Sequence, residues 1–164
     1  MLLDIRDDTQ LAHAWAKLQQ VGSLHPGLTI DGILVEAMAP RGLEMIVGAR
    51  RDRDWGPVTL VGLGGIWTEA LHDVRILPVG LDLGEITDEF GKLRGAPLLH
   101  GMRGEPARDV TALATIVQRI GALLAARPDI QEVDLNPVTV YAVGQGALAL
   151  DALIVMNAPD GRTS

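Results

Sequence analysis

The residues Asp134-Leu135-Asn136-Pro137 are followed, fourteen positions after Pro137, by Asp151 inside the apolar run 147–155. Side chains alternate between the two faces of a strand, so Asp134 and Asn136 are predicted to point the same way. Pro137 cannot donate a ladder hydrogen bond and is predicted to end that strand or to place it at an edge. Oxygen ligands converging from neighbouring strands suit Mg²⁺. The alternative is that Asn136 caps a turn and Asp151 accepts local backbone hydrogen bonds.

Hydrophobic patterning places this stretch in a sheet covered by helices. Strands are predicted over residues 32–38, 43–49, 58–63, 73–79, 130–133, 138–143 and 147–155. Turn chemistry over residues 50–57 predicts a hairpin. Helices are predicted from Asp7 to about Val21 and over 105–126, with short helical patterns between 82 and 104. The predicted fold class is therefore α+β, with a mostly antiparallel or mixed sheet and packed helices.

The composition is that of a folded globular protein. The chain has 164 residues, of which 48% are hydrophobic and 21% charged, which excludes a disordered polymer. Its formal charge of −7 argues against a general nucleic-acid surface, because such a surface needs a basic face. The absence of cysteine excludes disulfides, thiolate metal sites and cysteine nucleophiles. We predict one unit over residues 1–156 and a frayed tail over 157–164.

Several functional classes lack the residues that they require. The start of the chain has no secretory signal, and no apolar stretch is long enough to span a bilayer, so a cytoplasmic protein is predicted. The four histidines have no metal-ligand spacing, and serine is nearly absent. No self-sufficient set of catalytic residues is identified.

A glycine run, Gly62-Leu63-Gly64-Gly65, follows the predicted strand 58–63. Glycines let backbone N–H groups approach a phosphate closely. The run is not a Walker A loop, because no Gly-Lys-Ser/Thr follows it. Taken alone, the pattern is more typical of a tight turn than of a ligand-binding loop.

Six segments occur in a consistent order over residues 4–155: 32–38, 42–48, 51–52 with 56–58, 62–66 with Glu69, 97–104, and 134–137 with Asp151. In this order they resemble the ATP-grasp region of NDP-forming acyl-CoA synthetases. The single motifs are weak, but their ordered combination is specific. The β subunits of succinyl-CoA synthetase resemble the chain more distantly.

The resemblance implies a C-terminal ATP-grasp subdomain that uses ATP or ADP and Mg²⁺. It implies a role in acyl-CoA + ADP + phosphate ⇌ carboxylic acid + CoA + ATP, through a phosphohistidine outside this chain. It also implies that Asn136 and Asp151 hold the Mg²⁺, with Asp134 beside them. The implied nucleotide contacts are Val35, Glu36, Ala37, Met38, Gly64 and Gly65.

Two departures from the family pattern bear on activity. The usual Gln-Glu pair of the hinge strand stands here as Glu36-Ala37, and the two lysines, Lys17 and Lys92, lie away from a nucleotide loop. The N-terminal ATP-grasp and CoA-binding domains are therefore expected elsewhere in the same protein or complex, and the chain alone is expected to be inactive. The alternatives are a catalytically silent docking or regulatory module, and the same region of a fused protein acetyltransferase.

Overall fold

The computed structural model describes residues 1–25, 27, 31–65, 73–102 and 104–157. The chain divides into two compact units, Met1–Pro40 and Arg41–Ser164. The sequence predicts one unit over residues 1–156, and the joint action of the two units as one domain stays a prediction. No helix within the described ranges is both long and apolar enough to cross a bilayer.

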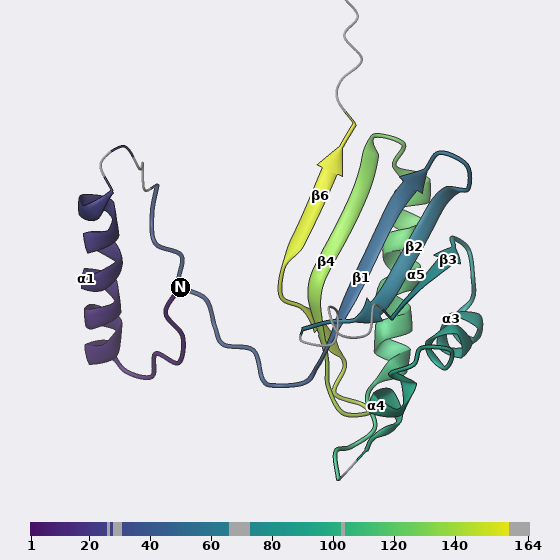
Figure 1. The fold of residues 1–164 in the computed structure, drawn as a ribbon, viewed down its shortest axis with the longest axis horizontal. Helices are drawn as coiled ribbons and strands as arrows, with labels where there is room; N and C mark the ends of the chain where they lie inside the picture. The colour runs from purple at the N-terminus through teal and green to yellow at the C-terminus, as the bar shows by residue number, and fades with distance from the viewer. Residues whose placement is uncertain (26, 28–30, 66–72, 103, 158–164) are drawn as a thin grey trace, which may run out of the picture. The chain divides into compact units, whose positions relative to one another are not determined.

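The first unit is built on helix α1, Asp8–Leu24 (Figure 1). Asp7 caps the helix, since its carboxylate accepts a hydrogen bond of 2.7 Å from the Gln10 N–H, and the predicted start is confirmed. The helix extends three residues beyond its predicted end at about Val21. The helix ends at Leu24, and the next residue, His25, precedes Pro26 in the sequence. A proline disfavours the helical conformation in the residue before it.

The strand predicted over residues 32–38 is wrong. These residues form neither helix nor strand. A strand needs a partner that completes its backbone hydrogen bonds, and within the described residues no ladder includes this segment. Most of its apolar side chains are exposed, with Leu34 at 81% and Val35 at 63%.

The second unit is a six-stranded sheet in the order β3-β2-β1-β4-β5, with β6 also paired to β4 (Figure 1). All the described strand pairs are antiparallel, which confirms the predicted α+β class. The strands are β1 Leu43–Asp52, β2 Gly56–Leu63, β3 Val74–Pro78, β4 Ile130–Val140, β5 Ala147–Ala149 and β6 Ala152–Met156. The predicted hairpin is β1 and β2, in which Asp52 pairs with Gly56.

Helices cover one face of the sheet. They are α3 Leu83–Phe90, α4 Ala96–His100 and α5 Val110–Ala126. Helix α5 starts later than predicted because Asp109, not the region of Pro106, caps it. The core joins the buried stripe of α5 to the sheet and includes Leu113, Val117, Leu124, Met45, Val47, Val61, Val133 and Val138.

Among the described residues of the second unit, no helix covers the other face of the sheet. Met45, Val47 and Ala49 of β1 point into the core, so Glu44, Ile46, Gly48 and Arg50 point away from it. Directly paired residues of antiparallel strands share a face. We call this side of the sheet the open face, and it carries the candidate site.

Asp109 ties α5 to the turn between β4 and β5. Its carboxylate accepts hydrogen bonds from the backbone N–H groups of Ala112 at 3.1 Å, Gly146 at 3.1 Å and Gly144 at 2.9 Å. These bonds stabilise the charged carboxylate and hold the pKa of Asp109 below its ordinary value.

We expect Asp109→Asn to remove a pH-dependent part of the stability. A carboxyl group whose pKa is lowered by folding stabilises the fold above its unfolded pKa, and this stabilisation is lost as pH falls through the folded value. In urea unfolding, the deficit of the variant should therefore be full above about pH 5 and shrink towards pH 2. A deficit that stays constant over this range would contradict the assignment.

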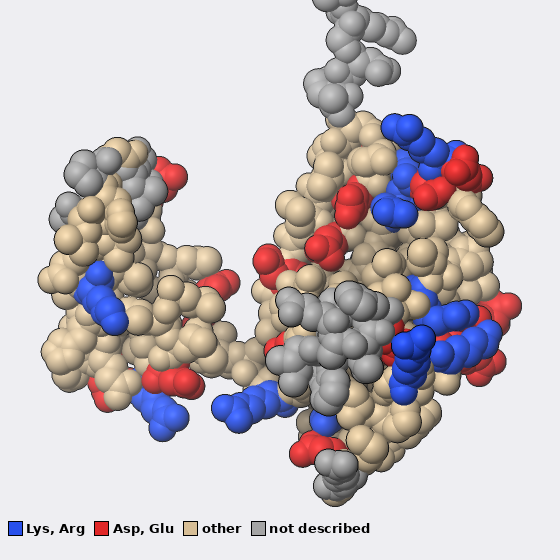
Figure 2. Space-filling view, in the orientation of Figure 1, with Lys and Arg blue, Asp and Glu red and all other residues tan. Residues whose placement is uncertain are grey.

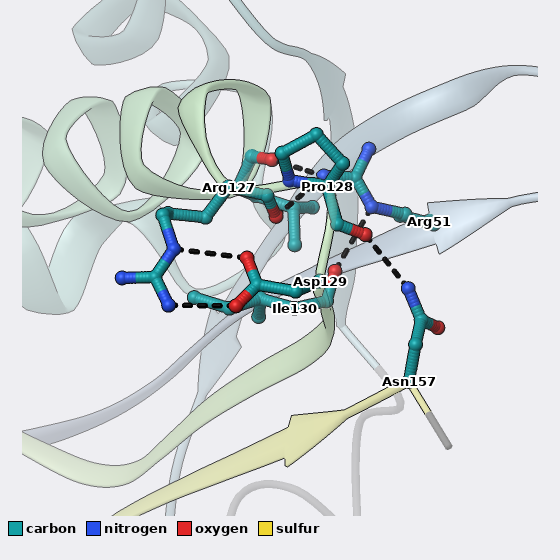
Figure 3. Close-up of polar contacts among 7 residues, drawn as sticks. Arg51, Arg127, Pro128, Asp129, Ile130 and Asn157 are labelled. Carbon is teal, nitrogen blue, oxygen red and sulfur yellow. Dashed lines mark hydrogen bonds and ion pairs between the residues drawn. The ribbon is translucent and has the colours of Figure 1, made fainter. Parts of the chain in front are cut away.

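Arg51 joins β1 to the end of α5 and the start of β4 (Figure 3). Its Nε donates to the Ile130 carbonyl at 2.9 Å, and its Nη2 donates to the carbonyls of Arg127 at 2.8 Å and of Leu124. The last carbonyls of a helix have no partner within the helix, so a guanidinium placed there satisfies groups that would otherwise need water.

Candidate metal and nucleotide site

Strand β4 runs through Pro137 without ending. The prediction of two strands over 130–133 and 138–143 is wrong, because one strand spans Ile130–Val140. Its register with β1 shifts, since Met45 pairs with Val138 but Val47 pairs with Leu135. The resulting bulge adds one residue to β4, and a bulge is a position where a proline without an N–H is tolerated. The Asn136–Pro137 peptide bond within it is cis.

A second interruption lies directly across from this bulge. The predicted strand 147–155 is divided into β5 and β6 by Leu150 and Asp151. Ala149 pairs with Val138 and Ala152 with Leu135, so the two intervening residues face Asn136 and Pro137. A hydrogen bond of 2.9 Å from the Leu150 N–H to the Pro137 carbonyl closes the gap. The structure therefore brings Asn136 and Asp151 together from positions fifteen residues apart.

The bulge at Asn136 and Pro137 of β4 lies opposite the break at Leu150 and Asp151 between β5 and β6, and we call the two together the paired interruption. The polar side chains at this paired interruption differ in their surroundings. Asp151 is exposed, and its Oδ1 accepts a hydrogen bond of 2.8 Å from the Ala152 N–H, which agrees with the local-bond alternative for one of its oxygens. Asn136 is exposed, and none of the described residues hydrogen-bonds its side chain. Asp134 is half-buried on the open face, opposite Gly48 of β1 and Leu153 of β6.

The side chains of Asn136, Asp151 and Asp134 could supply some of the ligands of a Mg²⁺ ion, and water or phosphate oxygens would supply the others. These side chains offer carboxylate and carboxamide oxygens, which a hard cation prefers. Among the described residues no group of three or more His, Cys, Asp or Glu could hold a metal ion by itself. Mg²⁺ binds through one or two carboxylates and keeps waters and phosphate oxygens as its other ligands. The residues present fit such an ion.

The glycine run lies at the same end of the open face. The Gly64 N–H donates to the Glu44 carbonyl at 2.8 Å, and Glu44 pairs with Thr139, three residues from Asn136. Gly65 has a φ of +59°, and the Glu44 Oε2 lies 2.6 Å from the position that its Cβ would occupy. The Gly64 N–H is therefore engaged, and a carboxylate faces the loop. This arrangement suits hydroxyl or amino groups of a ligand better than a bare phosphate.

Asp73 closes the base of the glycine loop. Its carbonyl accepts a hydrogen bond of 3.4 Å from the Leu63 N–H, and its carboxylate accepts one of 2.8 Å from the Gly95 N–H. Gly95 packs so closely on Leu63 that an added Cβ would lie 2.1 Å from a Leu63 methyl. The glycine loop is thus held to both β1 and the start of α4. Glu69 and Arg103, which belong to the motifs named above, lie outside the described residues.

A hollow of 210 Å³ lies on the open face between β1, β2, β3 and β4. Its lining includes Ile46, Gly48, Leu60, Ile76, Arg50 and Asp134. Figure 2 shows acidic side chains over β4 and β6 on this side of the sheet. A negative surface repels a polyanion, so a metal ion bound beside these carboxylates would favour phosphate binding at this face.

The predicted hinge residues belong to the other unit and are described within it. Val35, Glu36 and Met38 line a mainly apolar cavity of 370 Å³, together with residues of α1 and of the segment 1–8. Ala37 is exposed. The nucleotide contacts assigned to these residues stay a prediction.

Comparison with known proteins gives a consistent set of relatives. The family model described as "ATP-grasp domain" matches residues 1–156. The chain is 40% identical over 158 residues to a trans-feruloyl-CoA synthase from an unknown prokaryotic organism, covering 96% of this chain and 22% of the relative. It is 32% identical over 157 residues to the beta subunit of ADP-forming acetate–CoA ligase I of Pyrococcus furiosus, covering 94% and 66% respectively.

Solved structures agree with the sequence matches. The dinucleotide-forming acetyl-coenzyme A synthetase 1 of Ca. Korarchaeum cryptofilum, in complex with coenzyme A and Mg-AMPPCP, superposes with a TM-score of 0.81 at 28% identity. The match covers 95% of this chain and 67% of that chain. The chain spans less than two thirds of the length of each of the two relatives matched by sequence.

Proposed function

Since the chain belongs to the ATP-grasp domain family, we propose that it is the nucleotide- and Mg²⁺-binding portion of an NDP-forming acyl-CoA synthetase. In this proposal Asn136 and Asp151 bind the metal, with Asp134 beside them. The observation that carries the proposal is the paired interruption, because it brings two oxygen ligands together at a fixed point of the sheet. The solved relative with Mg-AMPPCP supports the choice of nucleotide and metal.

Each residue at the site has a defined task in this proposal. Mg²⁺, when bound, neutralises charge on the nucleotide phosphates. The Asn136 carboxamide and the Asp151 carboxylate orient that ion, and the Leu150–Pro137 hydrogen bond fixes their spacing. Glu44, next to Gly65, accepts hydrogen bonds from ligand hydroxyl or amino groups. The apolar floor formed by Ile46 and Leu60 keeps water away from the phosphates.

The complete reaction requires parts beyond this portion. We propose that a phosphohistidine segment, a CoA-binding domain and an N-terminal ATP-grasp subdomain of the same protein or complex supply the remaining groups. The complete enzyme would be cytoplasmic and would interconvert acyl-CoA, ADP and phosphate with a carboxylic acid, CoA and ATP. Lys92 offers no phosphate clamp here, because it pairs with Glu89. The isolated chain is therefore expected to show no synthetase turnover.

We expect the chain alone to bind Mg-ADP weakly and only with the metal. Half of a two-subdomain cleft offers metal oxygens but does not enclose the ligand, and the net charge of −7 opposes a polyanion. The dissociation constant should be no tighter than roughly 1 mM, about −4 kcal/mol. Titration of the ¹⁵N-labelled chain with Mg-ADP should shift the amides of residues 134–136 and 150–152, and a chelator should abolish these shifts.

Asp54→Ala is the matched control, because it removes the same charge from the exposed β1–β2 turn. It should leave the Mg-ADP shifts unchanged, whereas Asp151→Ala should remove them. Micromolar binding that survives chelation would contradict the half-site proposal. A complete lack of response at 10-fold excess over roughly 1 mM would favour the catalytically silent module.

A further inference from the structure

Strand β6 has no buried face that selects its register. Its five residues, Ala152–Met156, are all apolar and all exposed. Leu153 and Val155 lie on the open face at 59% and 38% exposure, and Ile154 and Met156 lie on the other face at 49% and 48%. Strand register is specified strongly only where one face is buried and weakly elsewhere. Something other than side-chain packing must therefore fix β6 against β4.

The two ends of the strand supply fixed points. At one end the Leu150 N–H donates to the Pro137 carbonyl at 2.9 Å. At the other end Asn157 makes two bonds, from its N–H to the Asp129 carbonyl at 2.8 Å and from its Nδ2 to the Pro128 carbonyl at 2.7 Å. Figure 3 shows the Asn157 carboxamide pointing at this carbonyl.

The turn that receives Asn157 is itself held in place. The Arg127 guanidinium donates to both carboxylate oxygens of Asp129, at 2.9 and 2.7 Å. Arg51 donates to the carbonyls of Arg127 and Ile130 on either side of Pro128 and Asp129 (Figure 3). Asn157 is thus bound to a segment anchored to both β1 and α5, which makes it a fixed reference for the end of β6.

We propose that Asn157 is a positioning residue that sets the register of β6 and so holds Asp151 across from Asn136. A slip of one residue would move Asp151 by about 3.3 Å along the strand and turn its side chain to the opposite face. Asp151 precedes β6 directly, so the register of β6 decides where its carboxylate lies. The role of Asn157 in metal binding rests on the proposed function, whereas its role in register does not.

The specific contribution of asparagine is the carboxamide donor. Any residue except proline would supply the backbone N–H at this position. Only a side chain with a donor of this length also binds the Pro128 carbonyl, and an aspartate would place a carboxylate against that oxygen. Asn157→Asp therefore keeps the size of the side chain and removes the bond, and Asn157→Ala removes both.

The test compares these two variants with Gln118→Ala in the full 164-residue chain. Gln118 is a matched control, because it is also an exposed carboxamide that donates to a backbone carbonyl, that of Leu81 at 3.2 Å. Hydrogen exchange and cross-strand contacts by NMR report the β4–β6 register. Line broadening on titration with Mn²⁺, a stand-in for Mg²⁺, reports the metal affinity.

Both Asn157 variants should lose at least 10-fold of the exchange protection of the β6 amides and at least threefold of the Mn²⁺ affinity. In both Asn157 variants, the NMR contacts between Asp134 and Leu153 should be accompanied by a second set of contacts from a register shifted by one residue. Gln118→Ala should leave the exchange protection, the cross-strand contacts and the Mn²⁺ affinity unchanged. Wild-type register and protection in both Asn157 variants would overturn the proposal. A wild-type chain that does not bind Mn²⁺ would contradict the metal site alone, and the register readout would still decide the role of Asn157.

Discussion

Asp151→Ala is expected to reduce phosphoryl transfer at least about 100-fold in a full-length synthetase that contains this region. The substitution removes one of the two proposed oxygen ligands that the paired interruption brings together. A metal ion contributes several kcal/mol to the stabilisation of charge on a transferring phosphoryl group, so the loss of a ligand acts directly on the rate. The measurement is single-turnover formation of phosphohistidine from Mg-ATP, with CoA binding followed separately and expected to stay unchanged.

Asn136→Ala should produce a similar loss, and Asp54→Ala provides the matched control. Asp54 is exposed in the β1–β2 turn and does not line the hollow on the open face. Its removal changes the net charge as Asp151→Ala does, without removing a predicted ligand. Wild-type turnover of both Asp151→Ala and Asn136→Ala at limiting Mg²⁺ would show that the metal assignment is wrong.

Arg51→Met is expected to lower the free energy of unfolding by about 3 kcal/mol. The variant keeps the apolar stem but leaves the carbonyls of Leu124, Arg127 and Ile130 without their donor. Hydrogen bonds to a charged donor contribute about 1.5–3 kcal/mol each, and three bonds to one guanidinium do not add fully. Urea unfolding followed by circular dichroism measures the change.

The neighbouring Arg50 supplies the control for this experiment. Its side chain is 62% exposed, and its contact with Asp52 spans 3.6 Å. Exposed pairs of this kind contribute little, so Arg50→Met should change the free energy of unfolding by no more than about 0.5 kcal/mol. Equal losses in the two variants would mean that the Arg51 hydrogen bonds do not stabilise the fold.

Much of the second unit could be predicted from local sequence signals. Alternating apolar residues and the turn chemistry of residues 50–57 identify the β1–β2 hairpin, and the helical spacing of Val117 and Leu124 identifies α5. These elements form where expected because local preference and burial agree. The start of α5 differs because a cap depends on which nearby carboxylate reaches the first N–H groups, and spacing alone does not choose between Asp109 and the Pro106 region.

The interruptions in β4 and β5–β6 could not be predicted, because they depend on register between distant segments. In the sequence, Pro137 is typical of a strand end. In the structure, the strand continues through Pro137 because a bulge opposite Met45 and Val47 accommodates it. The approach of Glu44 to Gly65 likewise requires the β1–β2 register, and the sequence alone indicates only a solvated strand residue there. The segment 32–38 has the pattern of a strand, but a pattern does not supply the partner that a strand needs.

The strand pattern raises convergence of Asn136 and Asp151 as one of two alternatives, and the ordered resemblance favours it. Their spacing alone does not decide whether the chain returns to the same point of the sheet. The structure supplies that link through the pairs Val138–Ala149 and Leu135–Ala152. Asn157 gave no signal, because a polar residue after an apolar strand is ordinary and its partners in the turn 128–129 precede it by almost thirty positions.

The Met1–Pro40 unit buries little apolar surface, which has a consequence for the affinity for nucleotide. Within the described part of this unit Ala14 is the one apolar side chain that is buried. A segment of this size with so little buried surface has almost no cooperative stability of its own. If its residues contact the nucleotide, part of the intrinsic binding energy is used to order them, and the apparent dissociation constant rises by the inverse of the fraction already ordered. Any mutation or partner that preorganises this unit would therefore tighten nucleotide binding without adding a single contact to the ligand.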